Sequence, residues 1–242
     1  MALNAGDIAA ARHLAEEALG LHRAFGGAWD TAYCLQLLGH TTLDEKDFQK
    51  AEQLLEESAQ LFRELGDQHH SLFATHLLAW NHYRSGDRDR ARALWEDNLQ
   101  RAGATGDRNM EALSLGALAD NVAVEEGRME DALSMLTQAY RINRDLGMPS
   151  VQTAMDLSRF ARGLAFAGRA VAATRVLASR EVLYEEIGAR VRPIDAEKDE
   201  KTLGAIRSQL DEGTFAEAWE QGRSLTADDA VELALAEVPR DA

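Results

Sequence analysis

Glycines recur along this 242-residue chain with a period of about forty residues. The first series follows the apolar end of a helix-like segment, with successive spacings of 40, 40, 41 and 41, at Gly26, Gly66, Gly106, Gly147 and Gly188. A second series of turn residues lies between them, each followed five residues later by an alanine, at Gly6, Lys46, Gly86, Gly127, Gly168 and Gly213. A fixed period of this length is typical of repeat proteins, in which each unit packs only on its neighbours.

Two turn positions in each period divide every unit into two predicted helices. The segment 48–65 shows the pattern best, because apolar or small residues recur in it at three- and four-residue steps and therefore share one helix face. Gly66 is expected to end this helix in the left-handed conformation, and Asp67 to cap the next one. The chain has only three prolines, which agrees with helix nearly throughout.

These patterns predict an all-α fold, an α-solenoid of antiparallel helix pairs with a divergent C-terminal cap. The predicted parts of this one continuous domain are an incomplete first repeat (1–26), four full repeats (27–66, 67–106, 107–147, 148–188) and a divergent helical pair with a capping helix (189–242). Thr226 and Asp229 have the spacing of a capping box, which predicts a final helix at 227–236. The helix expected at 8–25 lacks a partner before it, so its apolar face is a candidate homodimer interface, as is the C-terminal cap.

The spacing of small residues and turns resembles the tetratricopeptide repeat. A small residue, a turn seven positions later and an alanine five beyond occur at Gly39, Lys46 and Ala51 and again at Ala79, Gly86 and Ala91. The resemblance covers about residues 4 to 190 and implies a right-handed superhelix. The chain departs from the family in its longer period, in lacking a proline after the second helix, and in having Asp120 where a small residue is expected.

The longer units, together with the closing run FAEAWEQGRSLTADDAVELALAE, are similar to the helical-repeat segments of large multidomain bacterial signalling ATPases and transcription regulators. This resemblance implies a sensor or scaffold module of a longer bacterial protein. It implies recognition of a protein or peptide segment, or of a small effector, without chemistry.

Charge and cysteine content narrow the possible partners and setting. The formal net charge of −15 would repel nucleic acid and anionic membrane surfaces. The single cysteine, Cys34, lies in a helical run and reads as a buried free thiol. No signal peptide is recognisable and no stretch of about 18 apolar residues occurs. We therefore expect a cytoplasmic chain with no direct nucleic-acid or membrane partner.

Motifs of enzymatic type are missing from the sequence. It contains no glycine-rich phosphate loop and no nucleophile elbow, and its carboxylates are expected on polar helix faces. His69, His70, His76 and His82 are spaced by one, six and six residues, whereas ligands on one helix share a face only at three or four. We expect no catalytic residues, no metal site and no cofactor.

The family resemblance implies that the first helix of each unit lines a concave groove. The groove residues carried over on this basis are Tyr33, Gln36, His40, Phe73, His76, Trp80, Tyr83, Asn121 and Arg162. Four of them, Phe73, His76, Trp80 and Tyr83, lie at steps of three and four and form one aromatic face. They either bind a ligand or pack against neighbouring helices. The corresponding functions are a binding module and a structural spacer or self-association element.

Overall fold

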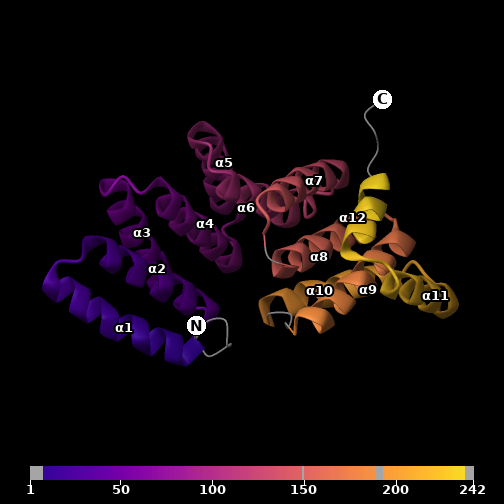
Figure 1. Cartoon of the computed structure of the whole chain (residues 1–242), viewed down its shortest axis with the longest axis horizontal. Coiled ribbons are helices and arrows are strands. Elements are labelled where there is room, and N and C mark those ends of the chain that lie inside the picture. The colour runs from indigo at the N-terminus through magenta and orange to yellow at the C-terminus, as the bar shows by residue number, and fades with distance from the viewer. Residues whose placement is uncertain (1–7, 149, 189–192, 238–242) are drawn as a thin grey trace. The chain divides into compact units, whose positions relative to one another are not determined.

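The computed structural model describes residues 8–148, 150–188 and 193–237, and all regular structure in these ranges is helical (Figure 1). The helices follow in the order α1 (Ile8–Phe25), α2 (Ala28–Asp44), α3 (Phe48–Glu64), α4 (Gln68–Ser85), α5 (Arg88–Thr105), α6 (Arg108–Leu118), the π-helical segment η1 (Ala119–Ala123), α7 (Met129–Asp145), α8 (Ser150–Phe166), α9 (Ala170–Ile187), α10 (Pro193–Arg207), α11 (Glu212–Arg223) and α12 (Ala227–Ala236). The all-α prediction is confirmed.

Helices end where the two glycine series predict. A left-handed backbone with φ between 63° and 98° occurs at Gly26, Gly66, Gly86, Gly106, Gly127, Gly147, Gly168 and Gly188. Lys46 adopts the same conformation with φ of 66°. Gly6 lies outside the described residues. The turn predicted at Gly213 is wrong, because α11 begins at Glu212 and the side chain of Asp211 accepts a hydrogen bond from the Thr214 N–H.

Helix starts are capped as the sequence indicates. The Asp67 carboxylate accepts a hydrogen bond from the His70 N–H at 3.0 Å, at the N-terminus of α4. The predicted capping box is present, since Thr226 and Asp229 each bond to the other's backbone N–H. Both devices satisfy amide groups that have no partner within the helix.

The chain divides into two compact units, with the division between Ser114 and Leu115. In the first unit each helix from α1 to α5 packs on the next along the chain. Small residues allow close crossings there: a Cβ added to Gly39 of α2 would lie 2.6 Å from Cδ2 of Leu55 in α3. Gly39 therefore has the packing role that its place in the repeat predicts.

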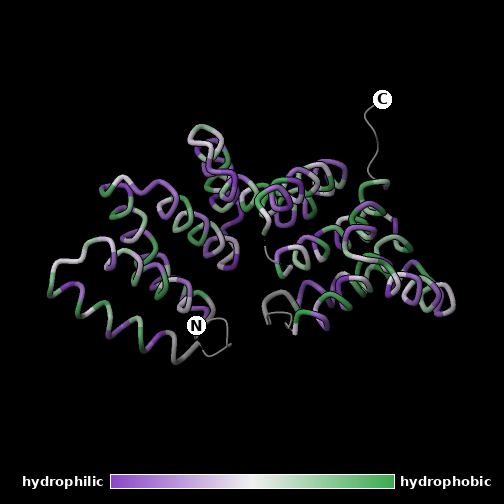
Figure 2. The backbone as a smooth tube through the Cα atoms, viewed as in Figure 1, coloured by the Kyte–Doolittle hydropathy of each residue, from purple (hydrophilic) through white to green (hydrophobic). Residues whose placement is uncertain are grey.

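In the second unit α9 is the central helix, in contact with α8, α10, α11 and α12, while α7 packs on α8 and η1. Its hydrophobic core includes Leu133, Leu157, Phe160, Leu177 and Ile206, all buried. Hydropathy alternates along the helices (Figure 2), and none of the described helices has the length and apolar character needed to cross a membrane.

The contact between α9 and α11 depends on Gly222. A Cβ at this position would lie 2.4 Å from the backbone oxygen of Arg175, so the two helices could not keep their distance. We expect Gly222→Ala to reduce the free energy of unfolding by about 1 to 3 kcal/mol, as overpacking does. Gly204 in α10 is the matched control, because nothing lies within 4 Å of its added Cβ and alanine favours helix.

Urea unfolding of both glycine variants would measure the difference. Gly204→Ala is expected to be neutral or slightly stabilising. Equal unfolding free energies for the two variants would contradict the close crossing of α9 and α11.

Candidate functional site

A pair of aromatic rings is exposed on α2. Trp29 and Tyr33 lie one helical turn apart, and their rings stack with centroids 5.3 Å apart and an interplanar angle of 10°. Trp29 is 40% exposed and Tyr33 38% exposed. Large aromatic side chains are usually well covered in folded proteins, so two stacked and accessible rings are a candidate contact surface. We call this pair the aromatic platform.

The platform is held in place by residues of α3 and α4. The indole N–H of Trp29 donates a hydrogen bond of 2.8 Å to the Asp67 carboxylate, whose second partner is the His70 ring nitrogen Nδ1 at 2.9 Å. The His70 ring packs edge-on against Trp29 at 5.2 Å and stacks on the buried Phe62 at 5.0 Å. Because these contacts fix the ring orientation before any ligand arrives, binding would cost little side-chain entropy.

The charge on Asp67 is maintained by the same contacts. Burial by itself would raise the pKa of this carboxyl group, but the hydrogen bonds from Trp29 and His70 outweigh burial, so the pKa is lowered from its ordinary value. Asp67 is therefore a carboxylate at neutral pH. It both caps α4 and anchors the platform.

The aromatic run on α4 packs largely within the first unit. The buried Trp95 of α5 meets Trp80 at 5.7 Å, Tyr83 at 6.0 Å and His76 at 6.3 Å between ring centroids. His76 is buried, while Phe73, Trp80 and Tyr83 are half-buried. Of the two alternatives for these residues, the geometry favours packing between α4 and α5. Ligand contact by the half-buried rings stays a prediction.

Two further groove residues lie on α2 with Tyr33. Gln36 is buried, and its side-chain amide donates to the backbone oxygen of His70 at 3.2 Å. His40 is half-buried. Since the Gln36 amide ties α2 to the first turn of α4, it supports the platform and offers no free surface to a ligand in this structure.

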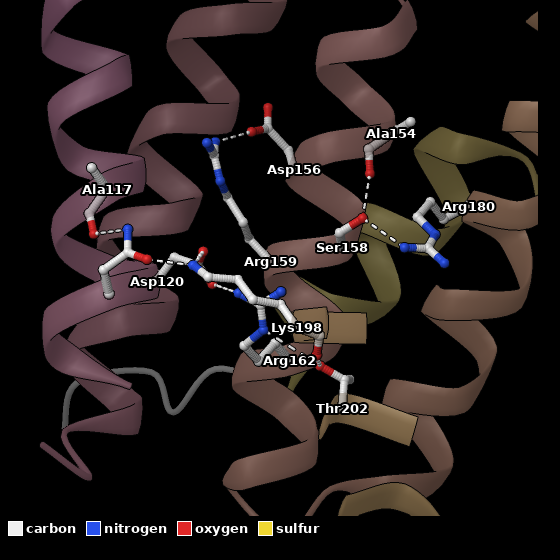
Figure 3. Close-up of polar contacts among 11 residues, drawn as sticks. Ala117, Asp120, Ala154, Asp156, Ser158, Arg159, Arg162, Arg180, Lys198 and Thr202 are labelled. Carbon is white, nitrogen blue, oxygen red and sulfur yellow. Dashed lines mark hydrogen bonds and ion pairs between the residues drawn. The ribbon is translucent and has the colours of Figure 1, made fainter. Parts of the chain in front are cut away.

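The last two groove residues, Asn121 and Arg162, are buried in the second unit and both belong to one ion cluster. Figure 3 shows Arg162 in this cluster with Asp120 and Lys198. Arg162 of α8 forms an ion pair with Asp120, and Lys198 of α10 contacts Asp120 at 2.7 Å and also the amide oxygen of Asn121. Asp120 and Asn121 belong to η1, a wider helical turn of a kind often found at functional sites. Burial withdraws both predicted residues from ligand contact in this structure.

The ionisation of this cluster follows from its charges. Burial alone would raise the pKa of Asp120, yet the positive charges of Lys198, Arg162 and Arg159 hold it well below the usual carboxyl range. For Lys198, burial and the two nearby guanidinium groups outweigh the attraction of Asp120, so its pKa is lowered. One carboxylate is shared among several cations, and this explains why the pKa of Asp120 and the pKa of Lys198 are both lowered.

The expectation that carboxylates lie only on polar helix faces is wrong at three positions. Asp120, Asp156 and Asp199 are buried. Each is paired: Asp156 with Arg159 at 3.0 Å and Asp199 with Arg180 at 2.5 Å, in addition to the Asp120 pairs. The pairs of Asp120 and Asp199 join neighbouring helices of the second unit, whereas Asp156 and Arg159 both lie on α8. Pairing is what makes buried carboxylates tolerable.

Sequence reasoning missed the residues that organise these sites. Trp29 stands three residues after Gly26 in a predicted helix start, and Asp67 was recognised only as a cap. One signal was available in the sequence. Asp120 stands where the repeat pattern predicts a small residue, which indicates that this position differs from its equivalents in the other units. Nothing in the sequence indicates that Lys198 reaches Asp120.

Among the side chains of the described residues, no group of three or more His, Cys, Asp and Glu could hold a metal ion. Cys34 is buried and is a free thiol, and burial raises its pKa. The chain matches no protein-family model, and no curated protein matches it.

Proposed function

We propose that this chain is a non-catalytic binding scaffold of the tetratricopeptide-repeat type, a right-handed solenoid that recognises a protein segment, and that it is a module of a bacterial regulator. Support comes from the lengths of α1 to α5, each 17 or 18 residues, from the glycine turns at a forty-residue period and from the successive packing of these five helices. The buried charged residues of the second unit are paired with one another. Such pairing agrees with a structural role for them and with a function of recognition without chemistry.

The observation that carries the proposal is the aromatic platform. Trp29 and Tyr33 are accessible, yet they are held by hydrogen bonds and ring contacts from α3 and α4. Aromatic residues that are rigid and exposed are the usual anchors of protein interfaces, because they bury much area with little loss of entropy. The predicted groove residue Tyr33 is part of this anchor.

Selection from a random peptide display library tests the proposal. The wild-type protein and the double variant Trp29→Ala/Tyr33→Ala would be immobilised separately, and peptides retained by each would be sequenced. We expect a set of peptides that binds the wild type at least about tenfold more tightly than the double variant, as for loss of an interface anchor. Selected peptides that all bind both proteins equally would contradict a platform-based function.

A second candidate function, self-association, is favoured by the outer face of α1. Leu14, Leu21 and Phe25 lie on one stripe of this helix and are 59%, 58% and 84% exposed. Exposed apolar stripes of this kind are typical of surfaces that pair with another helix. In this alternative the platform has no ligand, and sedimentation would show a mass that rises with protein concentration.

A further inference from the structure

The platform lies in an acidic setting. Asp30 follows Trp29 directly on α2. Its side chain is 53% exposed, and its carboxylate lies 3.8 Å from His22 Nδ1. The Asp67 carboxylate accepts a hydrogen bond from the Trp29 indole N–H. The faces of aromatic rings are themselves electron-rich. The rings and both carboxylates thus favour a cation over an apolar or anionic ligand.

Elsewhere in this protein, partly exposed rings are covered by arginine. The guanidinium carbon lies 5.9 Å from the ring centre of Phe48 for Arg84, 5.7 Å from Tyr83 for Arg88 and 5.2 Å from Phe215 for Arg207. Over residues 8–148, 150–188 and 193–237, no arginine or lysine lies over Trp29 or Tyr33. The stacked pair of Trp29 and Tyr33 is therefore accessible to a cation from another molecule.

Arginine suits this surface better than lysine. A guanidinium is planar, stacks on aromatic faces and is weakly hydrated, whereas an ammonium holds its water strongly. Asp30 and Tyr33 lie three residues apart on α2 and are therefore neighbours on the helix surface. A guanidinium on the rings could thus also donate to the Asp30 carboxylate. The net charge of −15 adds a long-range attraction for basic segments.

We propose that the aromatic platform, with Asp30 beside it, binds an exposed arginine side chain of a partner protein segment. This inference rests on the proposed function and specifies its ligand. The arginine stacks on the indole ring, while Asp67 and His70 keep that ring in position.

Calorimetric titration with synthetic peptides tests the proposal. The probe is a short glycine and serine peptide with several arginines, and the reference peptide has citrulline, which keeps the shape but not the charge, at the same positions. At about 0.15 M salt, which screens general attraction, we expect the arginine peptide to bind the wild type at least about tenfold more tightly than the citrulline peptide.

Variants separate the platform from general attraction to an acidic protein. Trp29→Ala is expected to weaken arginine-peptide binding about tenfold, and Trp29→Phe, which keeps a ring but loses the bond to Asp67, several-fold. Asp30→Asn should also weaken it several-fold. Phe166→Ala is the matched control, because Phe166 is a 47% exposed aromatic outside the platform, and it should bind as the wild type does.

The outcomes distinguish this inference from the proposed function. Equal affinity for the arginine and citrulline peptides, or unchanged arginine-peptide affinity in both Trp29 variants, would overturn the arginine assignment. If display selection still yields peptides without basic residues that require Trp29 and Tyr33, the binding function stands and the inference fails. If no selected peptide requires the platform, both fail.

Discussion

Replacing Asp120 by asparagine is expected to lower the free energy of unfolding of the second unit by about 3 to 5 kcal/mol, the usual cost of removing one partner of a buried ion pair. The carboxylate is 7% exposed and pairs with both Arg162 and Lys198. Asparagine has nearly the same shape but no charge, so two cations would remain buried without their counter-ion. Urea unfolding, followed by hydrogen exchange in peptides from α8 and α10, would measure the loss.

Two controls distinguish lost pairing from lost packing. Asp131 is 55% exposed and pairs with Arg128 at 2.9 Å, so Asp131→Asn should change stability by no more than about 1 kcal/mol. The triple variant Asp120→Leu/Arg162→Met/Lys198→Met should recover much of the stability lost in Asp120→Asn, because it removes the buried carboxylate together with both of its cationic partners. Similar losses for Asp120→Asn and Asp131→Asn would show that the cluster contributes little.

The stability of the wild type and that of Asp120→Asn should depend differently on pH. The pKa of Asp120 is lowered in the folded state, so its contribution is present above the ordinary carboxyl pKa of about 3.9 and is lost as the pH falls below it. Asp156 has a raised pKa through burial and acts in the opposite direction, but it is present in both proteins. The stability advantage of the wild type over Asp120→Asn should therefore shrink from pH 7 towards pH 3.

Truncating Trp95 is expected to destabilise the first unit by about 3 to 5 kcal/mol, as for other buried large aromatics. Its side chain is 0% exposed, and its ring contacts those of Trp80, Tyr83 and His76 between α4 and α5. Trp95→Ala would leave a cavity that these three rings border. Urea unfolding and the emission of Trp80 would report the change, since Trp80 would gain access to water.

An exposed aromatic of the same unit provides the comparison. Phe25 is 84% exposed, so Phe25→Ala should alter stability by about 0.5 kcal/mol or less. If Trp95→Ala and Phe25→Ala had the same effect, the aromatic run on α4 would not be held by packing on α5. Its half-buried rings would then regain their place as ligand contacts.

Local signals in the sequence were sufficient for the helices and their ends. The predicted helices at 8–25 and 227–236 agree with α1 and α12 residue for residue, because amphipathic periodicity, caps and left-handed glycines act within a few residues of each other. The error at Gly213 has the same origin. The repeat spacing suggested a turn, but Asp211 supplied a cap that begins the helix one residue before the glycine.

Burial of the candidate site residues was much less predictable. Tyr33 is exposed, whereas Gln36, His76, Asn121 and Arg162 are buried. All five lie on helices that the sequence indicated, and the repeat frame suggested that they share a groove. The repeat pattern does not predict how much of each side chain a neighbouring helix covers. The coverage depends on the side chains that pack across the helix contact.

The sequence by itself therefore determined an all-helical chain with regularly spaced turns, caps and a buried thiol at Cys34. Only the tertiary structure decided which polar residues meet. Trp29 reaches Asp67 across 38 residues of chain, and Lys198 reaches Asp120 across 78. Helix periodicity is a property of short segments, while these contacts form only when helices distant in sequence have packed and removed their side chains from water.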